Sequence, residues 1–261
     1  RLVPALLAVS AQLPVVQLLR AVVHRLVRSD FPKKWTGVLD SLAGLLLDTA
    51  AGQEAVRVGL LVLHEIVEWK GYENDELTER VYATFLPRLY QLATSGFASG
   101  DWATVKAVLK TLFSAIAYRP TPSVMAEPRA IEWCTLMSQV IAGSVPPAEN
   151  AMDEEAKTTS IFWKARKWAL HCQNKIMSRY GCPDGSSFQQ HKRSQASGFA
   201  KFYMTNLALP VLKVNLEAVQ AIVHGQAQPP AKHFNLLCDY LGELVRSKTL
   251  WAAVKPHIHT I

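Results

Sequence analysis

Apolar residues recur every three or four positions along most of the chain, which is the spacing of one face of an α-helix. Short segments rich in proline, glycine, aspartate and serine interrupt this pattern at intervals. Sustained alternation of apolar and polar residues, the mark of a half-buried strand, is absent from the sequence. The chain is therefore predicted to be all-α. The predicted helices cover about residues 14–30, 32–48, 52–67, 75–92, 102–116, 131–141, 158–181, 188–222, 231–245 and 250 onward.

The spacing of the helices predicts a repeat architecture. Five of them start near residues 14, 52, 102, 158 and 231, and the early intervals are close to the ~40–47 residues of HEAT repeats. We expect a right-handed superhelical array of antiparallel helix pairs, a HEAT-repeat α-solenoid in which each pair buries its apolar face against its neighbours. A closed helical bundle would give nearly the same pattern.

The whole of residues 1–261 is expected to form one solenoid domain of about five helix pairs. Residues 1–9 have the pattern of the back half of a helix, and the last helix is unfinished, so the array is expected to be truncated at both ends. Pro87 should kink its helix, and Pro210 makes residues 188–222 either one kinked helix or two. Residues 96–100 are predicted to be a turn, and residues 144–157 a long loop.

The helix predicted for residues 158–181 carries two stripes. Its apolar stripe is flanked by a basic stripe one residue out of phase, with the N-cap predicted at Thr158 or Thr159. The basic stripe either contacts phosphate or an acidic partner, or is a solvated helix face. Lys192 and Arg193 would extend it if folding brings them near. The residues of the stripe are Lys164, Lys167, His171, Lys175 and Arg179.

Three consecutive acids precede this helix. Asp153, Glu154 and Glu155 are candidates for a charged contact with a basic partner. The alternative is a solubilising loop that also favours the positive N-terminal end of the next helix.

The overall charge narrows the classes of partner. A net charge of +7 and an isoelectric point near 9.3 favour an acidic partner such as nucleic acid or an anionic membrane. The glycine and aromatic signatures of common nucleic-acid modules are missing, and no apolar run reaches the ~18 residues of a membrane span. The four cysteines form no CxxC pair, which indicates a reducing compartment and argues against a zinc site.

The sequence contains no recognisable catalytic motif. A glycine-rich phosphate loop, HExxH and GxSxG are all missing, and His257 and His259 alone do not make a metal site. We therefore predict a protein that is not an enzyme, with no cofactor and no catalytic or metal-binding residues. The seven tryptophans are either interface anchors or, in most cases, core residues.

Four motifs occur in sequence order. Residues 163–181 contain Trp-Lys-x-x-Lys-Trp-Ala and end in Arg-Tyr-Gly. The other three motifs are Asp-Phe-Pro-Lys-Lys-Trp at 30–35, Phe-Leu-Pro at 85–87, and Leu-Trp followed by Val-Lys-Pro-His-Ile at 250–258. Together they resemble the importin-beta (karyopherin) family, and most closely its importin-seven and importin-eight branch, and the likeness spans nearly all 261 residues.

The resemblance implies a fragment from the N-terminal half of a nuclear transport receptor. Such a receptor would bind protein cargo, the small GTPase Ran in its GTP form and phenylalanine-glycine nucleoporins, and it would shuttle between cytoplasm and nucleus as a monomer. The acids at 153–155 would then be the preferred contact for Ran. Two alternatives remain from other classes: a HEAT or armadillo scaffold that assembles a signalling or phosphatase complex, and a helical nucleic-acid-binding domain.

Overall fold

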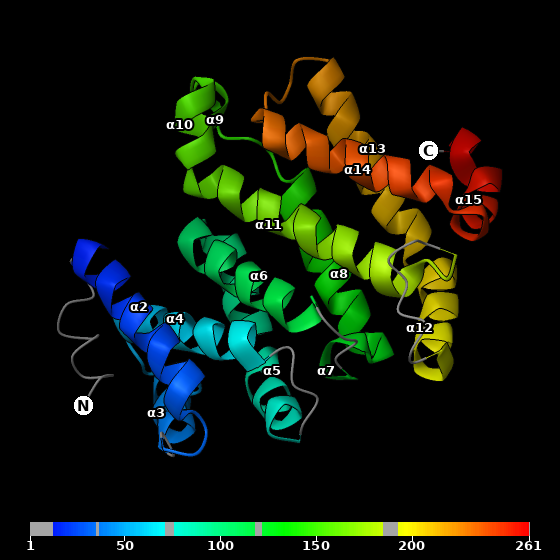
Figure 1. Cartoon of the computed structure of the whole chain (residues 1–261). Coiled ribbons are helices and arrows are strands. Elements are labelled where there is room, and N and C mark those ends of the chain that lie inside the picture. The colour runs from blue at the N-terminus through cyan, green and yellow to red at the C-terminus, as the bar shows by residue number, and fades with distance from the viewer. Residues whose placement is uncertain (1–12, 35–36, 71–75, 118–121, 185–192, 261) are drawn as a thin grey trace.

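The computed structural model describes residues 13–34, 37–70, 76–117, 122–184 and 193–260, and every regular element within these ranges is helical. The helices form two layers that run along the molecule together (Figure 1). We call them the α11 layer and the α8 layer. The α11 layer contains, in spatial order, α2 (Leu13–Asp30), α4 (Gln53–Lys70), α6 (Trp102–Ile116), α11 (Ile161–Ile176) and α14 (Ala231–Arg246).

The α8 layer packs against the first layer, with α3 on α4, α5 on α6 and α8 on α11. Short elements fill the joints between the long helices. The α8 layer consists of α3 (Val38–Leu46), α5 (Glu76–Ser99), α8 (Glu127–Ala142) and α13 (Ala208–Val223), with α12 (Arg193–Asn206) and α15 (Lys248–Val254) beside α13. The short elements are α7 (Pro122–Met125), α9 (Pro147–Asn150), α10 (Glu154–Thr159), the π-helix η1 (Met177–Gly181) and the 3₁₀-helix η3 (Lys255–Thr260).

Each long helix has its main contacts with the next helix in its own layer and with its partner in the other layer. This order is that of an open array, so the predicted all-α solenoid is confirmed and the closed bundle is wrong. The five start positions near 14, 52, 102, 158 and 231 mark the α11 layer. The sequence period therefore follows one layer, because each helix of that layer begins a new step of the array.

One continuous hydrophobic core fills the space between the layers, from Val23 on α2 to Val254 on α15. Trp133 is almost fully buried and meets Tyr90 edge-on at 5.2 Å between ring centroids. Trp163 is buried as well, whereas the other described tryptophans are partly exposed against the core. Trp35 of the first motif lies outside the described residues.

Several predicted boundaries are wrong. The long helix begins at Ile161 because Ser160, and not Thr158 or Thr159, supplies the N-cap oxygen to the Trp163 amide. The predicted loop at 144–157 contains α9 and the start of α10. The second predicted helix starts at Val38 instead of residue 32, and α5 continues through residue 96 to Ser99.

Pro210 does not kink a single helix. The chain breaks at Leu207, and Pro210 is the third residue of α13, where its missing amide hydrogen would have no intrahelical partner. Residues 198–206 of α12 and the helix α13 meet at 52°. Among the described helices none is long and apolar enough to cross a membrane alone, and only this bent pair meets the criteria of length and composition together.

Arginine side chains close the C-terminal ends of helices in neighbouring repeats. Arg88 on α5 donates from Nε to the Leu46 carbonyl oxygen of α3 at 2.8 Å, and Arg166 on α11 donates to the last carbonyl groups of α8. Arg179 donates to the Ala117 carbonyl oxygen just past α6. Exposed carbonyl groups and the negative end of the helix dipole both favour a cation at this position. These contacts fix the helix pairs relative to one another.

The four cysteines are free thiols, as the sequence spacing indicated. Cys134, Cys172 and Cys182 are buried, and Cys238 is exposed on α14. Burial raises the pKa of the Cys134 thiol to about 12, so it is inert at neutral pH.

Replacing Gly181 with alanine is expected to lower the free energy of unfolding by about 1–3 kcal/mol. A Cβ atom at this position would lie 2.6 Å from Cδ1 of Tyr203, whose ring is buried on α12 and has no room to move away. The measurement is urea unfolding followed by circular dichroism. Gly44 in α3 is the matched control because a Cβ atom there meets nothing within 4 Å, and Gly44→Ala should be neutral or slightly stabilising. Equal stability of the two variants would contradict the packing at Gly181.

Candidate partner-binding surface

The basic stripe predicted on α11 lies along the exposed face of the α11 layer. Lys164, Lys167, His171 and Lys175 are partly buried between α11 and its neighbours in this layer. The structure therefore places these four predicted residues on one face of α11. No ion pair to a carboxylate occurs for these three lysines among the described residues.

Neighbouring helices extend the stripe into a wider positive surface. Lys106 of α6 is close enough to Lys164 for their charges to interact, and Lys232 of α14 is similarly close to Lys167. Lys110 of α6 lies over the ring of Trp168, with Nζ 6.0 Å from the ring centroid. We call this surface the basic band. Its residues are Lys106, Lys110, Lys164, Lys167, Lys175 and Lys232.

An aromatic cluster supports the middle of the basic band. The rings of Phe113, Trp168 and His171 lie 5.3 to 5.7 Å apart between centroids. Lys167 Nζ lies 5.6 Å from the Trp168 centroid, and Lys175 Nζ lies 5.5 Å from the Phe113 centroid. Such cation–π contacts hold lysine side chains over a ring while leaving the ammonium groups accessible. The lysine side chains of the band are therefore packed on aromatic rings instead of being fully solvated.

The positive charges of the band act on one another. Burial lowers the pKa of Lys167 first, and the charges of Lys232 and Lys164 lower it further. Burial, then Lys167 and Lys175, lowers the pKa of His171, against an opposing contribution from Asp239. His171 is therefore mainly neutral at pH 7 and belongs to the aromatic cluster instead of the charged stripe. An acidic partner would relieve this repulsion.

Arg179, the last residue of the predicted stripe, serves the fold. Its guanidinium donates to the Ala117 carbonyl oxygen, and the adjacent Tyr180 hydroxyl donates to the Ile116 carbonyl oxygen at 2.6 Å. Both contacts cap the C-terminus of α6. Lys192 lies outside the described residues, and the side chain of Arg193 lies outside them as well.

The acidic triplet is largely built into the structure. Asp153 caps α10 by accepting the Ala156 amide at 2.7 Å, and Glu154 accepts the Ala231 amide at the start of α14 at 2.9 Å. Only Glu155 of the three has no side-chain hydrogen bond or ion pair among the described residues. All three acids are exposed, but Asp153 and Glu154 also connect α10 and α14 through backbone amides, and only Glu155 is uncommitted.

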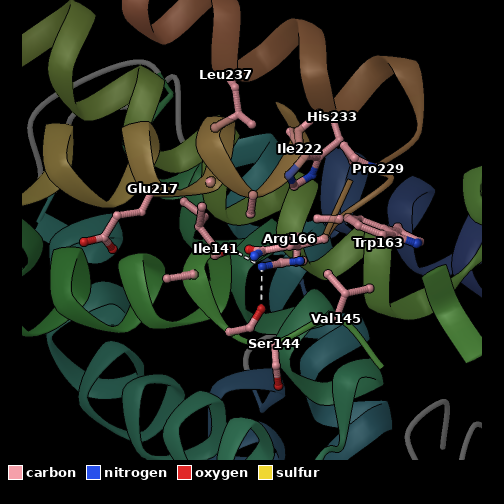
Figure 2. A pocket seen from close by; sticks show the side chains of 16 residues that line it. Ile141, Ser144, Val145, Trp163, Arg166, Glu217, Ile222, Pro229, His233 and Leu237 are labelled. Carbon is pink, nitrogen blue, oxygen red and sulfur yellow. Dashed lines mark hydrogen bonds between the residues drawn. The ribbon is translucent and has the colours of Figure 1, made fainter. Parts of the chain in front are cut away.

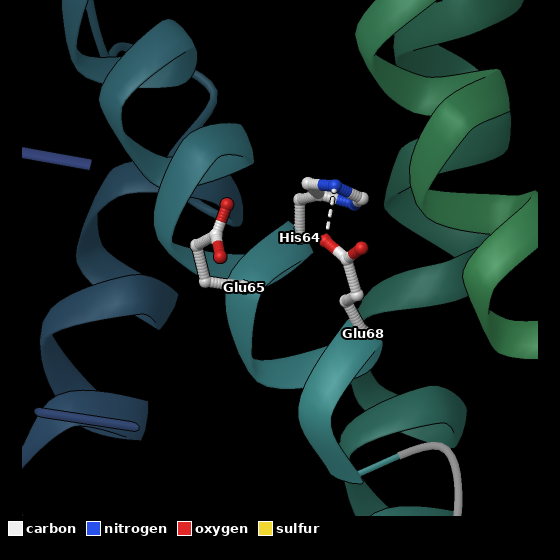
Figure 3. Close-up of side chains that lie close together, drawn as sticks. All are labelled: His64, Glu65 and Glu68. Carbon is white, nitrogen blue, oxygen red and sulfur yellow. Dashed lines mark ion pairs between the residues drawn. The ribbon is translucent and has the colours of Figure 1, made fainter. Parts of the chain in front are cut away.

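A charged cluster on α4 offers the closest approach to a metal-ligand set in the described part of the chain. Ligand atoms of His64, Glu65 and Glu68 lie within 4.8 Å of one another (Figure 3). Glu65 is already paired with Arg20 and His24 of α2, and His64 Nε2 lies 3.0 Å from Glu68. The hydrogen bond from His64 helps to lower the pKa of Glu68 to about 2. We interpret this group as an ion-pair cluster that joins α2 to α4.

A pocket of about 320 Å³ opens between the end of α8, α11, α13 and α14 (Figure 2). Arg166 lies at its centre and is only 5% exposed, yet its donors reach the carbonyl oxygens of Val140 at 3.0 Å and Gly143 at 2.7 Å. Burial lowers the pKa of Arg166 to about 10, so the side chain stays charged at neutral pH. His233 closes one wall, and Trp163 lies beside it at 5.4 Å between ring centroids.

The residues of the basic band outside α11 were not predicted from the sequence. Lys106 and Lys110 lie four residues apart, about one helical turn, and this spacing could have indicated that they share one face of their helix. Lys232 stands alone in its helix and gave no signal, because only the packing of α14 on α11 brings it to the band. Arg166 was missed because a charged residue on a helix is ordinarily exposed.

The amino-acid sequence of this chain is similar to those of known proteins. The chain is 25% identical to mouse Importin-8 over 90% of its own length and 23% of that protein. Zebrafish Importin-8 is 28% identical over 97% of this chain and 24% of that protein, and an importin beta-like SAD2 homolog from Arabidopsis thaliana is 24% identical over 90% of this chain and 22% of that protein. The chain is related to the importins.

The resemblance to the importin-beta family inferred from four motifs is thereby confirmed. The importin-related chain spans about a quarter of the length of these curated relatives. No family model matches the sequence, and no solved structure gives a significant match.

The structure explains the motif of this importin-related chain at residues 163–181. Trp163 is buried between α11 and α14, and Trp168 carries two lysines of the basic band over its ring. Tyr180 caps α6, and Gly181 lets α12 approach closely. The motif therefore takes part in the packing between neighbouring repeats and also carries the centre of the basic band.

Proposed function

We propose that this importin-related chain is a segment of a nuclear transport receptor that binds protein partners along the exposed face of the α11 layer. The observation that carries the proposal is the similarity to Importin-8 over 90% of the chain, together with the open order of the two helical layers. Residues 1–261 would form one stretch of solenoid of about five helix pairs.

Binding in this proposal rests on charge and shape, without bond chemistry. The basic band, with Lys164, Lys167 and Lys175 at its centre, attracts an acidic surface of the partner, and the aromatic cluster supplies apolar contact beneath it. The partners are protein cargo, Ran in its GTP form and phenylalanine-glycine nucleoporins. The receptor would shuttle between cytoplasm and nucleus, and Ran would exchange with cargo by competing for the same flexible array.

The test compares the two nucleotide states of Ran. The purified chain is passed over immobilised Ran loaded with a non-hydrolysable GTP analogue or with GDP, and binding is measured by surface plasmon resonance. A transport receptor segment should favour the GTP form by at least about tenfold, which corresponds to 1.4 kcal/mol. Equal binding to both forms would reject the transport role and favour the static scaffold.

Glu155 is the member of the acidic triplet that remains available for a Ran contact. Glu155→Lys is expected to weaken binding to the GTP form by about three- to tenfold, as is typical of a reversed charge at the rim of an interface. Glu217→Lys is the matched control, because Glu217 is an exposed acid in the middle of α13. Equal loss in both variants would show a general effect of net charge and remove Glu155 from the interface.

A further inference from the structure

A second pocket lies at the α10 and α14 end of the basic band. It has a volume of about 250 Å³ and is enclosed by the end of α10, the start of α11 and the start of α14. Four lysines, Trp163 and His233 account for most of its lining, and no carboxylate contributes to it. The four lysines are Lys157, Lys164, Lys167 and Lys232. We call it the lysine pocket.

Lys157 is the least exposed of these lysines. The residue is 6% exposed, and its side chain has no hydrogen bond or ion pair among the described residues. The described part of the chain therefore supplies no counter-charge for Lys157. No salt bridge joins it to the neighbouring Glu154, whose carboxylate oxygen Oε1 accepts the Ala231 amide. An anion in the pocket would compensate Lys157.

His233 provides an independent indication that a ligand belongs here. The residue is 3% exposed and lies between the lysine pocket and the pocket beside Arg166, lining both, and its Nδ1 atom has no hydrogen-bond partner among the described residues. A buried ring nitrogen without a partner loses a hydrogen bond that water would have made. With the proton on Nδ1, a neutral His233 can donate to an anion.

The start of α14 contributes less positive charge than its lysine does. The N-terminal end of a helix of 16 residues carries a partial positive charge and favours anions. The Glu154 carboxylate already accepts the Ala231 amide at this end. The positive charge of the pocket therefore comes from the lysine side chains of the three helices that enclose it.

We propose that the lysine pocket binds a compact phosphate-bearing anion. Four lysines that line a pocket of about 250 Å³ favour a ligand that carries at least two negative charges in a small volume. A phosphate monoester carries −1.5 to −2 charges and three acceptor oxygens, whereas a carboxylate carries one charge and two oxygens. Phosphate therefore matches the density of donors better than the acidic side chains of a protein do. Three of the four lysines also belong to the basic band, but the assignment does not rest on the transport role, because it concerns a small anion and not a protein partner.

Isothermal titration calorimetry with pyrophosphate tests the assignment at an ionic strength held near ~0.15 M, where long-range attraction is screened. Saturable binding at one site is expected. The variant Lys167→Gln with Lys232→Gln should bind at least about tenfold more weakly. Lys201→Gln with Lys213→Gln is the matched control, since both lysines are exposed on α12 and α13, and its affinity should stay within about twofold of the wild type.

Three outcomes would overturn the proposal. The first is no heat of binding at millimolar pyrophosphate, and the second is equal weakening in the two double variants, which would indicate attraction by net charge alone. The third is binding of a hexaglutamate peptide at least as tight as that of pyrophosphate, which would assign the pocket to carboxylates. Thermal unfolding of each variant confirms that it is folded. If the wild-type chain binds no pyrophosphate but discriminates between the forms of Ran, the pocket assignment fails and the transport role stands. If it binds pyrophosphate but does not discriminate, the transport role fails and the pocket stands.

Discussion

Arg166→Met is expected to lower the free energy of unfolding by about 3 kcal/mol or more. Methionine preserves most of the buried volume but donates no hydrogen bond, so the carbonyl oxygens of Val140, Ile141 and Gly143 at the end of α8 lose their partner together. Each hydrogen bond to a charged group contributes about 1.5–3 kcal/mol, and the relief of burying a cation offsets only part of the loss. The contacts of the guanidinium with the rings of Phe162 and Trp163 would also be lost.

The matched control is Arg129→Met on α8. Arg129 forms an exposed ion pair with Glu132 three residues later, with Nη1 2.7 Å from Oε2, and such pairs contribute at most about 1 kcal/mol. Urea unfolding of both variants gives the comparison. If Arg166→Met costs no more than Arg129→Met, the capping of α8 by α11 does not stabilise the joint between these repeats.

Acidification from pH 7 to pH 5 is expected to remove about 2 kcal/mol of stability through His233 alone. Burial, assisted by the charge of Arg166, lowers the pKa of His233 to about 3, whereas the unfolded chain titrates near the ordinary value of 6.5. Between these two values the unfolded state binds one more proton than the folded state. Stability therefore falls with decreasing pH by about 1.4 kcal/mol per unit, and the loss is complete below pH 3.

His233→Leu should remove this part of the pH dependence. The measurement is the urea midpoint at several pH values between 7 and 5, compared between variant and wild type. His224→Leu is the control, because His224 is exposed at the end of α13. His171, whose pKa is also lowered, contributes with the same sign in all three proteins. Parallel pH profiles for the wild type and His233→Leu would contradict the burial of a neutral His233.

The helical content and the positions of most long helices could be predicted because they depend on local periodicity. The turns of α6 and α14 carry their apolar residues at helical spacing, and the bounds found for them lie within a few residues of those predicted. Boundaries failed where competing caps were close together. Thr158, Thr159 and Ser160 are all suitable cap residues, and the choice of Ser160 is supported by its second hydrogen bond, to Glu149 on α9.

The candidate surface was predicted only in part. Lys164, Lys167 and Lys175 could be placed on one face because they share a helix. Arg179 belongs to the same stripe in sequence, but the end of α6 takes its guanidinium as a cap. Glu154 is exposed, as its sequence context suggests, but its carboxylate also caps α14, which begins 77 residues later in the chain. Contacts of this kind join neighbouring repeats, so no window of sequence contains both partners.

The sequence by itself determined that this chain is all-helical and that one face of residues 161–176 is basic, because a helix face repeats every three to four residues. Only the tertiary structure decided that the helices form an open array and which charges gather into a site. The lysine pocket takes Lys157, Lys164 and Lys232 from three different helices, and Arg166 and His233 are buried against expectation. The physical reason is that burial and electrostatic proximity depend on the packing of helices far apart in sequence, whereas periodicity depends on the helix alone.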